Sequence, residues 1–196
     1  MSHALRIAVA DDEPDVRDYF RRILPRLGHQ VVAVARTGRE LVEQCRAARP
    51  DLVITDIKMP DLDGIEAAVA IGRDEPIPVI LVSAYHHPQL FARAQGEHIL
   101  AYLVKPAKQA DLEAAIALAM QRFEQFQALR REAADLRQTL EDRKVIEQAK
   151  GLLMKQRGLD EEGAFRRLRM LARDSNRKMV EVSRMILRAR NPNRAL

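Results

Sequence analysis

Five side chains that suit phosphate chemistry stand at the ends of four short apolar runs of the sequence. Apolar, β-branched runs bounded by proline, glycine or charged residues are typical of buried parallel strands. The carboxyl ends of parallel strands meet at one edge of a sheet, and open α/β sheets bind their ligands there. We therefore expect one site that combines three carboxylates, a hydroxyl and an ammonium group, from Asp11, Asp12, Asp56, Ser83 and Lys105.

This set of groups predicts phosphoryl transfer onto a carboxylate. Clustered carboxylates repel one another unless a cation lies among them, and hard oxygen ligands of this kind suit Mg²⁺. A carboxylate can attack phosphorus to give an acyl phosphate, and Asp56 is the candidate nucleophile. The metal, Lys105 and Ser83 would then neutralise the transferred phosphoryl oxygens.

Strands and helices alternate along the first 110 residues and must position this site. Thr37, with Glu40 three positions later, matches a helix-capping box, and Gly28 suits the end of the preceding helix. Alternation of this kind predicts βαβ units with right-handed crossovers, and so an α/β fold with a doubly wound, five-stranded parallel sheet. We expect strands at 5–10, 31–35, 52–56, 78–82 and 101–104, and helices at 14–27, behind Thr37, at 64–72 and at 88–94.

Cysteine content and hydropathy bear on the compartment. The single cysteine, Cys45, allows no disulfide within the chain, and it lies on a predicted helix face with Leu41 and Val42. We therefore expect a buried thiol. No signal peptide begins the sequence, and no apolar run approaches the length of about 18 residues that a membrane helix requires. We expect a cytoplasmic protein without a membrane partner.

Charge is distributed unevenly between the two ends of the chain. Residues 1–110 carry 14 Lys and Arg residues against 15 Asp and Glu residues, whereas residues 143–196 carry 15 against 6. A basic run can be no more than a solvated face. An imbalance that extends over a whole domain instead favours a polyanionic partner.

The site residues resemble those of the receiver domain of two-component response regulators. The resemblance covers about residues 4–121 and implies a flavodoxin-like fold. It implies that a sensor histidine kinase phosphorylates Asp56, and that Mg²⁺ is bound by Asp12, Asp56 and the backbone carbonyl of Lys58, with Asp11 acting through water. The match rests on Asp11-Asp12, Asp56, Ser83 and Lys105-Pro106.

The same resemblance implies a conformational switch. Ser83 matches the switch hydroxyl, Tyr102 the switch aromatic and Lys105 the phosphoryl-stabilising lysine, while a cis bond is expected between Lys105 and Pro106. Other interpretations stay open, because Tyr102 also fits a plain core residue and Lys105 a solvated loop lysine. His86 and His87 fit polar loop residues better than ligands.

From Ala110 onward the pattern becomes helical. No proline occurs between Pro106 and Pro192, and apolar residues recur at spacings of four and three over about four heptads. The last receiver helix is therefore expected to continue into a coiled coil that dimerises the protein; the alternative is an amphipathic helix folded back on its own domain. The stripe contains Leu112, Ile116, Ala119, Phe123, Phe126, Leu129, Ala133, Leu136 and Leu140.

The end of the chain predicts three helices. The first continues the coiled coil and stops at Gly158, Asp160 caps the second, and Ser175 or Asn176 begins the third, which Pro192 ends. The inner face of the second helix is expected to hold Ala164, Phe165, Leu168, Leu171 and Ala172. The remaining basic residues, Lys150 among them, are expected on the outside.

This segment resembles the ANTAR output domain of transcription antitermination regulators, over about residues 127–188. The resemblance implies binding of paired RNA hairpins in nascent transcripts, and a compact basic bundle can neutralise RNA phosphates. With Phe165 expected in the core, base contacts would have to come from polar side chains. The match rests on Arg143, Ile146, Ala149-Lys150-Gly151, Met154, Gly158, Glu162, Ala164-Phe165, Leu168-Arg169, Ala172, Lys178 and Val182. The predicted RNA-binding residues are Lys150, Lys155, Arg157, Arg166, Arg169, Arg173 and Lys178.

Two hypotheses follow. The first is a phosphorylation-dependent response regulator that binds RNA hairpins and acts as an antiterminator, as a homodimer when phosphorylated. The second is a receiver-gated relay whose basic domain binds protein or DNA. No enzymatic activity is expected, since haloacid-dehalogenase-type phosphatases need a second aspartate where Lys58 stands. The expected domains are a receiver at 1–121, an output domain at 122–191 that begins with a coiled-coil helix at 122–142, and a tail at 192–196.

Overall fold

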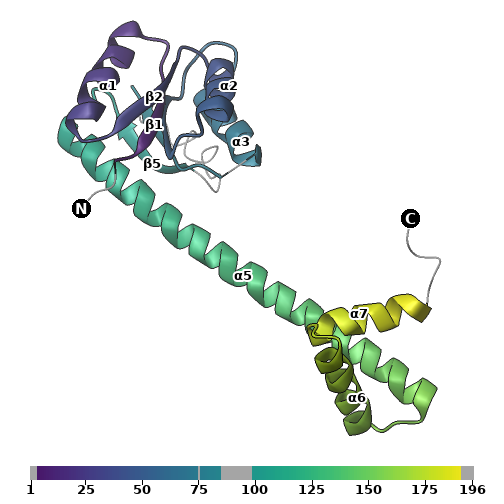
Figure 1. Cartoon of the computed structure of the whole chain (residues 1–196). Helices are drawn as coiled ribbons and strands as arrows, with labels where there is room; N and C mark the ends of the chain where they lie inside the picture. The colour runs from purple at the N-terminus through teal and green to yellow at the C-terminus, as the bar shows by residue number, and fades with distance from the viewer. Residues whose placement is uncertain (1–3, 75, 85–98, 191–196) are drawn as a thin grey trace. The chain divides into compact units, whose positions relative to one another are not determined.

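The computed structural model describes residues 4–74, 76–84 and 99–190. The chain divides into two compact units, Met1–Gln127 and Ala128–Leu196 (Figure 1). A 49-residue helix, α5 (Gln109–Arg157), contributes to both units. The predicted helix at 88–94, His86, His87 and the tail at 192–196 lie outside the described residues.

The first unit contains a parallel sheet of five strands in the order β2-β1-β3-β4-β5. This confirms the prediction of a doubly wound α/β fold. The strands are β1 (Arg6–Ala10), β2 (Gln30–Ala35), β3 (Leu52–Asp56), β4 (Val79–Ser83) and β5 (Ile99–Val104). The helices between them are α1 (Pro14–Arg26), α2 (Gly38–Ala48) and α3 (Gly64–Asp74).

Alternating side chains of the strands build a separate core on each face of the sheet. In β1, Ile7 and Val9 pack with α1 and the first turns of α5, whereas Ala8 and Ala10 pack with α2 and α3. All four are fully buried. Because both faces of the sheet are covered, a polar site is expected at the ends of the strands.

Local signals set several helix boundaries as predicted, with one difference. The Thr37 hydroxyl accepts a hydrogen bond from the Glu40 N–H at 3.2 Å, which is one half of a capping box. The other half differs, since the Glu40 carboxylate accepts from the N–H of Arg36, at 2.8 Å. Gly28, with a φ of 84°, follows α1 in the left-handed region that glycine adopts without strain.

Helix α5 divides the predicted apolar stripe into two parts. Leu112, Ile116 and Ala119 are buried in the core of the first unit, so they pack against their own sheet rather than against a second copy. Leu129, Leu136 and Leu140 are 59–65% exposed. The unbroken helix confirms the expected continuation beyond the receiver, and only its later part has an apolar stripe left for a coiled coil.

The second unit packs α6 (Glu161–Asp174) and α7 (Met179–Arg190) with the end of α5. Its core is centred on small and apolar side chains, Ala149 and Leu153 of α5 with Ala164 and Leu168 of α6. As predicted, Asp160 caps α6, its side chain accepting a hydrogen bond from the Gly163 N–H at 2.8 Å.

The start of the last helix was predicted too early. Ser175 still belongs to the end of α6, because its hydroxyl donates to the Leu171 carbonyl at 2.6 Å. Asn176 has a φ of 50°, which ends a helix rather than begins one. The Lys178 carbonyl accepts from Val182 N–H at 3.2 Å, so α7 begins directly after Lys178.

In the described ranges, no helix combines the length and the apolar character that crossing a bilayer requires.

Candidate functional site

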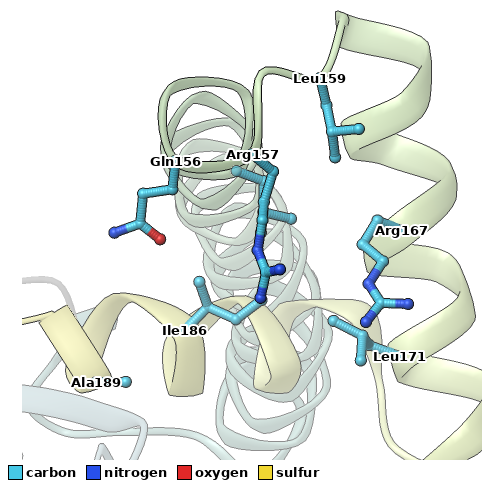
Figure 2. A pocket seen from close by; sticks show the side chains of 8 residues that line it. Gln156, Arg157, Leu159, Arg167, Leu171, Ile186 and Ala189 are labelled. Carbon is cyan, nitrogen blue, oxygen red and sulfur yellow. The ribbon is translucent and has the colours of Figure 1, made fainter.

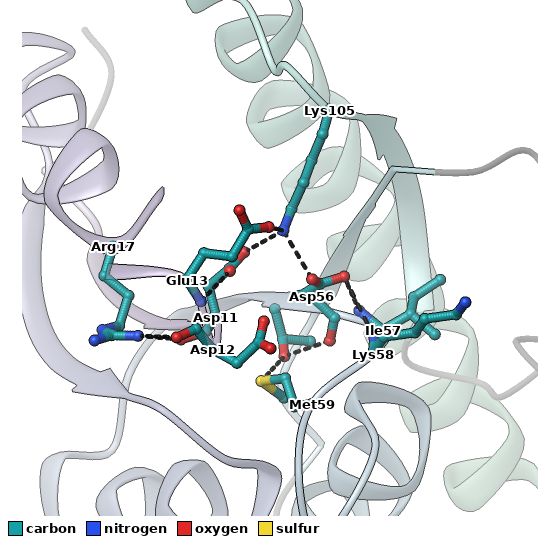
Figure 3. A network of polar contacts seen from close by, with 10 residues as sticks. Asp11, Asp12, Glu13, Arg17, Asp56, Ile57, Lys58, Met59 and Lys105 are labelled. Atoms are coloured by element: carbon teal, nitrogen blue, oxygen red, sulfur yellow. Dashed lines mark hydrogen bonds and ion pairs between the residues drawn. The ribbon is translucent and has the colours of Figure 1, made fainter. Parts of the chain in front are cut away.

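Asp56 ends β3 at the carboxyl edge of the sheet, and its carboxylate is held by donors on both oxygens (Figure 3). Oδ1 accepts hydrogen bonds from the N–H groups of Ile57, at 2.6 Å, and Lys58, at 3.3 Å. Oδ2 accepts from the Lys105 ammonium at 2.7 Å. The carboxylate is therefore fixed at the strand end, in a nearly buried position.

Lys105 brings three carboxylates together. Its Nζ lies 2.8 Å from Asp11 Oδ2, 3.0 Å from Glu13 Oε1 and 2.7 Å from Asp56 Oδ2. Burial by itself would lower the pKa of Lys105, but the contacts of its ammonium with the carboxylates of Asp11, Asp56 and Glu13 outweigh it and raise the pKa above its ordinary value. The lysine thus stays charged. The peptide bond to Pro106 is cis, as expected.

Asp11 has a buried oxygen that lacks a hydrogen bond. Its Oδ1 accepts from the Glu13 N–H at 3.0 Å, whereas Oδ2 has only the ion pair with Lys105 and no well-oriented donor among the described residues. Burial raises the pKa of Asp11, and the contact with the Lys105 ammonium offsets this only in part. A buried anionic oxygen in this situation is suited to a cation.

The donor set fits a hard divalent cation. One carboxylate oxygen from each of Asp11, Asp12, Glu13 and Asp56 lies within 4.8 Å of the others. Oxygen-only sites with few carboxylates are typical of Mg²⁺, which retains waters and takes up phosphate oxygens. Asp11 Oδ2, a buried oxygen without a hydrogen bond beyond its ion pair with Lys105, supports the same interpretation. Of the residues predicted as ligands, Asp11, Asp12 and Asp56 come together.

Lys58, Ser83 and Tyr102 occupy different positions around this edge. Lys58 follows Asp56 by two residues in the loop after β3, with its N–H directed at Asp56. Ser83 ends β4, is buried, and accepts the Lys105 N–H on its carbonyl at 2.9 Å, so it stands at the same edge of the sheet. Tyr102 lies within β5, half-buried against the core on the α2 and α3 face.

Sequence reasoning missed three residues that shape the site. Glu13 adds a fourth carboxylate, and its signal was its place between the acidic pair and the proline that begins α1. Arg17, one helical turn later, donates to the carbonyls of Asp11 and Asp12, at 2.7 Å each, and so holds the loop. Gly64 has no room for a side chain, because a Cβ would overlap the carbonyl oxygen of Asp56.

The basic residues of the second unit form a different kind of surface. Of those predicted to bind RNA, all but one are exposed, and they belong to α5, α6 and the turn before α7. Arg166 and Arg173, seven residues apart and so on one face of α6, have only loose ion pairs, each 3.8 Å long, with Glu162 and Asp174. The exposed residues are Lys155, Arg157, Arg166, Arg169, Arg173 and Lys178.

Lys150 corrects the sequence-based prediction of an outward-facing residue. Its side chain is only 10% exposed, and its ammonium lies 2.8 Å from Glu147 and 2.7 Å from Glu161. The hydrogen bonds that its ammonium donates to Glu147 and then to Glu161 raise its pKa. Since Glu161 begins α6, this ion cluster joins two helices of the bundle, and its ammonium is already engaged there.

Phe165 is a second correction, because it does not belong to the core. It is 42% exposed, whereas Ala164, Leu168 and Ala172 on the inner face of α6 are buried. A helix turns by about 100° per residue, so position 165 lies at the border of the inner face, next to Arg169 one turn later. The unit therefore does present an aromatic ring beside its basic residues.

Comparison with known proteins agrees with both units. The profile of the response regulator receiver domain matches residues 7–117, and that of the ANTAR domain matches residues 134–187. The transcriptional regulatory protein PdtaR of Mycobacterium tuberculosis is 39% identical over 182 residues, which span 93% of this chain and 89% of that protein.

Other similarities cover the receiver part. A protein-glutamate methylesterase/protein-glutamine glutaminase of Mesorhizobium japonicum is 42% identical over 81 residues, 41% of this chain and 24% of that enzyme. Among solved structures, a receiver domain protein from Clostridium thermocellum has a TM-score of 0.56 and 30% identity, covering 62% of this chain and 98% of that one.

A LuxR-family response regulator from Aurantimonas sp. SI85-9A1 has a TM-score of 0.57 and 29% identity, covering 61% of this chain and 88% of its own. The similarity to the methylesterase does not extend beyond the receiver domain, so it gives no basis for assigning an enzymatic activity to this chain. With both domain profiles matched and a relative similar over nearly its whole length, this chain belongs to the two-component response regulators that join a receiver domain to an ANTAR domain.

Proposed function

We propose that this protein is a phosphorylation-dependent antiterminator: a sensor histidine kinase phosphorylates Asp56, and the ANTAR domain then binds hairpins in nascent RNA. The observation that carries the receiver half is the contact of Lys105 with Asp11, Glu13 and Asp56 at one strand edge. The exposed arginines and lysines of the second unit support the RNA half.

Phosphorylation is argued from how Asp56 is held. Its Oδ1 is fixed by two backbone N–H groups and its Oδ2 by Lys105, so the nucleophile is oriented before a donor arrives. Mg²⁺, held by Asp12, Asp56 and the backbone carbonyl of Lys58, with Asp11 acting through water, would neutralise charge on the transferred phosphoryl group. Lys105 would then exchange part of its contact with Asp56 for a phosphoryl oxygen. Ser83, at the neighbouring strand end, is the candidate switch hydroxyl, and Tyr102 the candidate switch aromatic.

RNA binding is argued from cations that the fold does not use. Among the residues that the structure describes, the side chains of Lys155, Arg157 and Arg169 make neither a hydrogen bond nor an ion pair. Cations without protein partners are available for phosphates, and the counterions that a nucleic acid releases when its phosphates are neutralised favour binding. The exposed ring of Phe165 could stack on an unpaired base, as aromatic side chains do in other RNA-binding modules.

Dimerisation is argued from the exposed part of α5. Leu129, Ala133, Leu136 and Leu140 follow a 4-3-4 spacing, which places them along one side of the helix. A leucine gains about 1.5–3 kcal/mol when buried, and these three leucines find no cover within their own unit. A second copy of the same helix would cover the stripe and bring two ANTAR domains to one transcript.

The nature of the nucleic acid is tested by filter binding of the full chain, treated with acetyl phosphate and Mg²⁺. A hairpin RNA, an unstructured single-stranded RNA and a duplex DNA of equal length are compared at the same salt concentration. We expect the hairpin to bind most tightly. Equal affinity for all three ligands would reduce the basic unit to a nonspecific polyanion surface, and a preference for duplex DNA would contradict the proposal.

A further inference from the structure

Helices α5, α6 and α7 surround a pocket of about 630 Å³ within the second unit (Figure 2). This volume falls in the range of about 300–1,000 Å³ that is usual for ligand pockets. Its apolar wall is made by Leu153 of α5, Leu171 of α6 and Ile186 of α7. The three residues are buried or half-buried, so the wall belongs to the bundle and is preformed.

Polar groups line the rest of the pocket. Figure 2 shows the side chains of Arg157 and Arg167 entering the space between α5 and α6; Gln156, which also lines the pocket, lies on the far side of Arg157 from Arg167. In the described part of the chain neither guanidinium has a hydrogen bond or ion pair, unlike the neighbouring Arg166, which lies 3.8 Å from Glu162. Two uncompensated cations and an amide thus flank an apolar wall.

We propose that this pocket receives one unstacked nucleotide of the RNA hairpin loop. The base would lie against the apolar wall with Gln156 at its polar edge, and its phosphate would lie between Arg157 and Arg167. A nucleotide combines a flat apolar face, hydrogen-bonding edges and one anion, and this is the combination that the lining offers. The inference deepens the proposed function and rests on it, because it assigns the position where a loop base is read.

This assignment separates two roles on α6. Arg167 and Leu171, four residues apart, face the pocket, whereas Arg166 is not among its lining residues. Arg166 would contact phosphates without regard to base, and Arg167 would act together with the base in the pocket. Base contacts specify and phosphate contacts position, so the two arginines should respond differently to removal of a base.

The experiment measures hairpin affinity of the phosphorylated full chain for an intact loop and for loops that each carry one abasic nucleotide. For the wild type we expect one loop position at which base removal weakens binding on the order of tenfold. In Arg167→Gln, and in Ala189→Leu, which fills the pocket from α7, the same removal should cost much less. In the matched variant Arg166→Gln, binding should weaken for every hairpin by a similar factor, and the abasic penalty should remain.

The outcomes separate this inference from the proposed function. If the wild type binds the hairpin but no abasic position matters, or if Arg167→Gln and Ala189→Leu keep the full penalty, the pocket does not read a base and the inference fails. In both cases RNA binding itself would stand. If the wild type does not prefer the hairpin at all, the proposed function fails and this inference fails with it.

Discussion

The two units of the molecule use charge in opposite ways. At the edge of the sheet, the Lys105 ammonium is nearly buried and contacts three carboxylates within 3.0 Å. In the helical unit, Arg157, Arg167 and Arg169 are exposed and have no partner among the residues that the structure describes. Buried charges must be compensated within the protein, whereas exposed cations are hydrated and stay available to an anionic ligand. The charged groups of the first unit therefore pair with one another, whereas those of the second unit are available to a bound ligand.

The largest expected effect is the loss of the phosphoacceptor. Replacing Asp56 by Asn keeps the size of the side chain and removes the nucleophilic oxygen, so phosphorylation by acetyl phosphate and Mg²⁺ should be abolished. Mass measurement of the intact protein detects the adduct. Asp12→Ala should also prevent Mg²⁺-dependent phosphorylation. If Asp56→Asn still gained an undiminished phosphoryl adduct, the phosphoacceptor would be another residue, and the charge cluster at the sheet edge would not be the phosphorylation site.

A second large effect is expected on assembly. Replacing Leu136 and Leu140 by Asp puts charges into the stripe on α5, where burying an unpaired charge is strongly unfavourable. The proposed dimer of the phosphorylated protein should weaken by at least about 100-fold, which corresponds to a loss of about 2.8 kcal/mol in the free energy of association. Light scattering measures the mass. The same mass for this variant and for the phosphorylated wild type would mean that the stripe is not the dimer interface.

A smaller effect is expected from the exposed arginines. The double variant Arg166→Gln and Arg173→Gln should weaken hairpin binding and reduce the slope of log affinity against log salt by about 1.4, if each arginine contacts one phosphate. Glutamine preserves helix propensity, so circular dichroism should be unchanged.

The matched control for this prediction is the double variant Arg39→Gln and Arg46→Gln. These two arginines are also exposed and seven residues apart, but they lie on α2 of the receiver. This control variant removes the same charge. We expect its hairpin affinity, and its slope of log affinity against log salt, to be close to those of the wild type. Equal losses in the two double variants would indicate that net charge alone governs binding, without a defined face on α6.

The smallest effect concerns acid. The hydrogen bond from Lys150 lowers the pKa of Glu161 from its ordinary value of 4.5. A carboxyl whose pKa is lowered in the folded state stabilises the protein fully at pH values above its pKa in the unfolded state. This contribution is lost as the pH falls through the pKa of the folded state. Hydrogen exchange at the α6 amides, corrected for intrinsic rates, should therefore accelerate below about pH 4.5.

In Glu161→Gln this acid sensitivity should be reduced, whereas Glu162→Gln, whose pairing with Arg166 is loose, should behave like the wild type. If all three proteins lose protection in parallel, the ion cluster of Lys150 does not hold α6 to α5.

The difference between the sheet unit and the helical unit also explains which features could be predicted from the sequence. The strand ends that carry Asp56, Ser83 and Lys105 follow from local apolar runs, and the sheet brings such ends together whatever the intervening helices contain. Glu13 was missed because its inclusion depends on how the loop before α1 turns, which Arg17 stabilises through the carbonyls of Asp11 and Asp12.

In the helical unit, periodicity could predict the helices but not which border residues become buried. Lys150 is covered because Glu161, from another helix, reaches its ammonium, and no spacing along one helix reveals that contact. Phe165 lies at the border of the inner face, so a small rotation of α6 decides its exposure. The late start of α7 depends on Asn176 adopting the left-handed region. Cys45, by contrast, was predicted from its helix face, and burial raises the pKa of its thiol to about 12.

The central claim is that phosphorylation of Asp56 controls RNA binding by the other unit. The most direct test is hairpin affinity at fixed salt for the wild type and Asp56→Asn, each with and without acetyl phosphate. We predict that acetyl phosphate tightens binding by the wild type and leaves Asp56→Asn unchanged at the weaker value. If the wild type binds the hairpin equally well before and after phosphorylation, the two units act independently and the claim is contradicted.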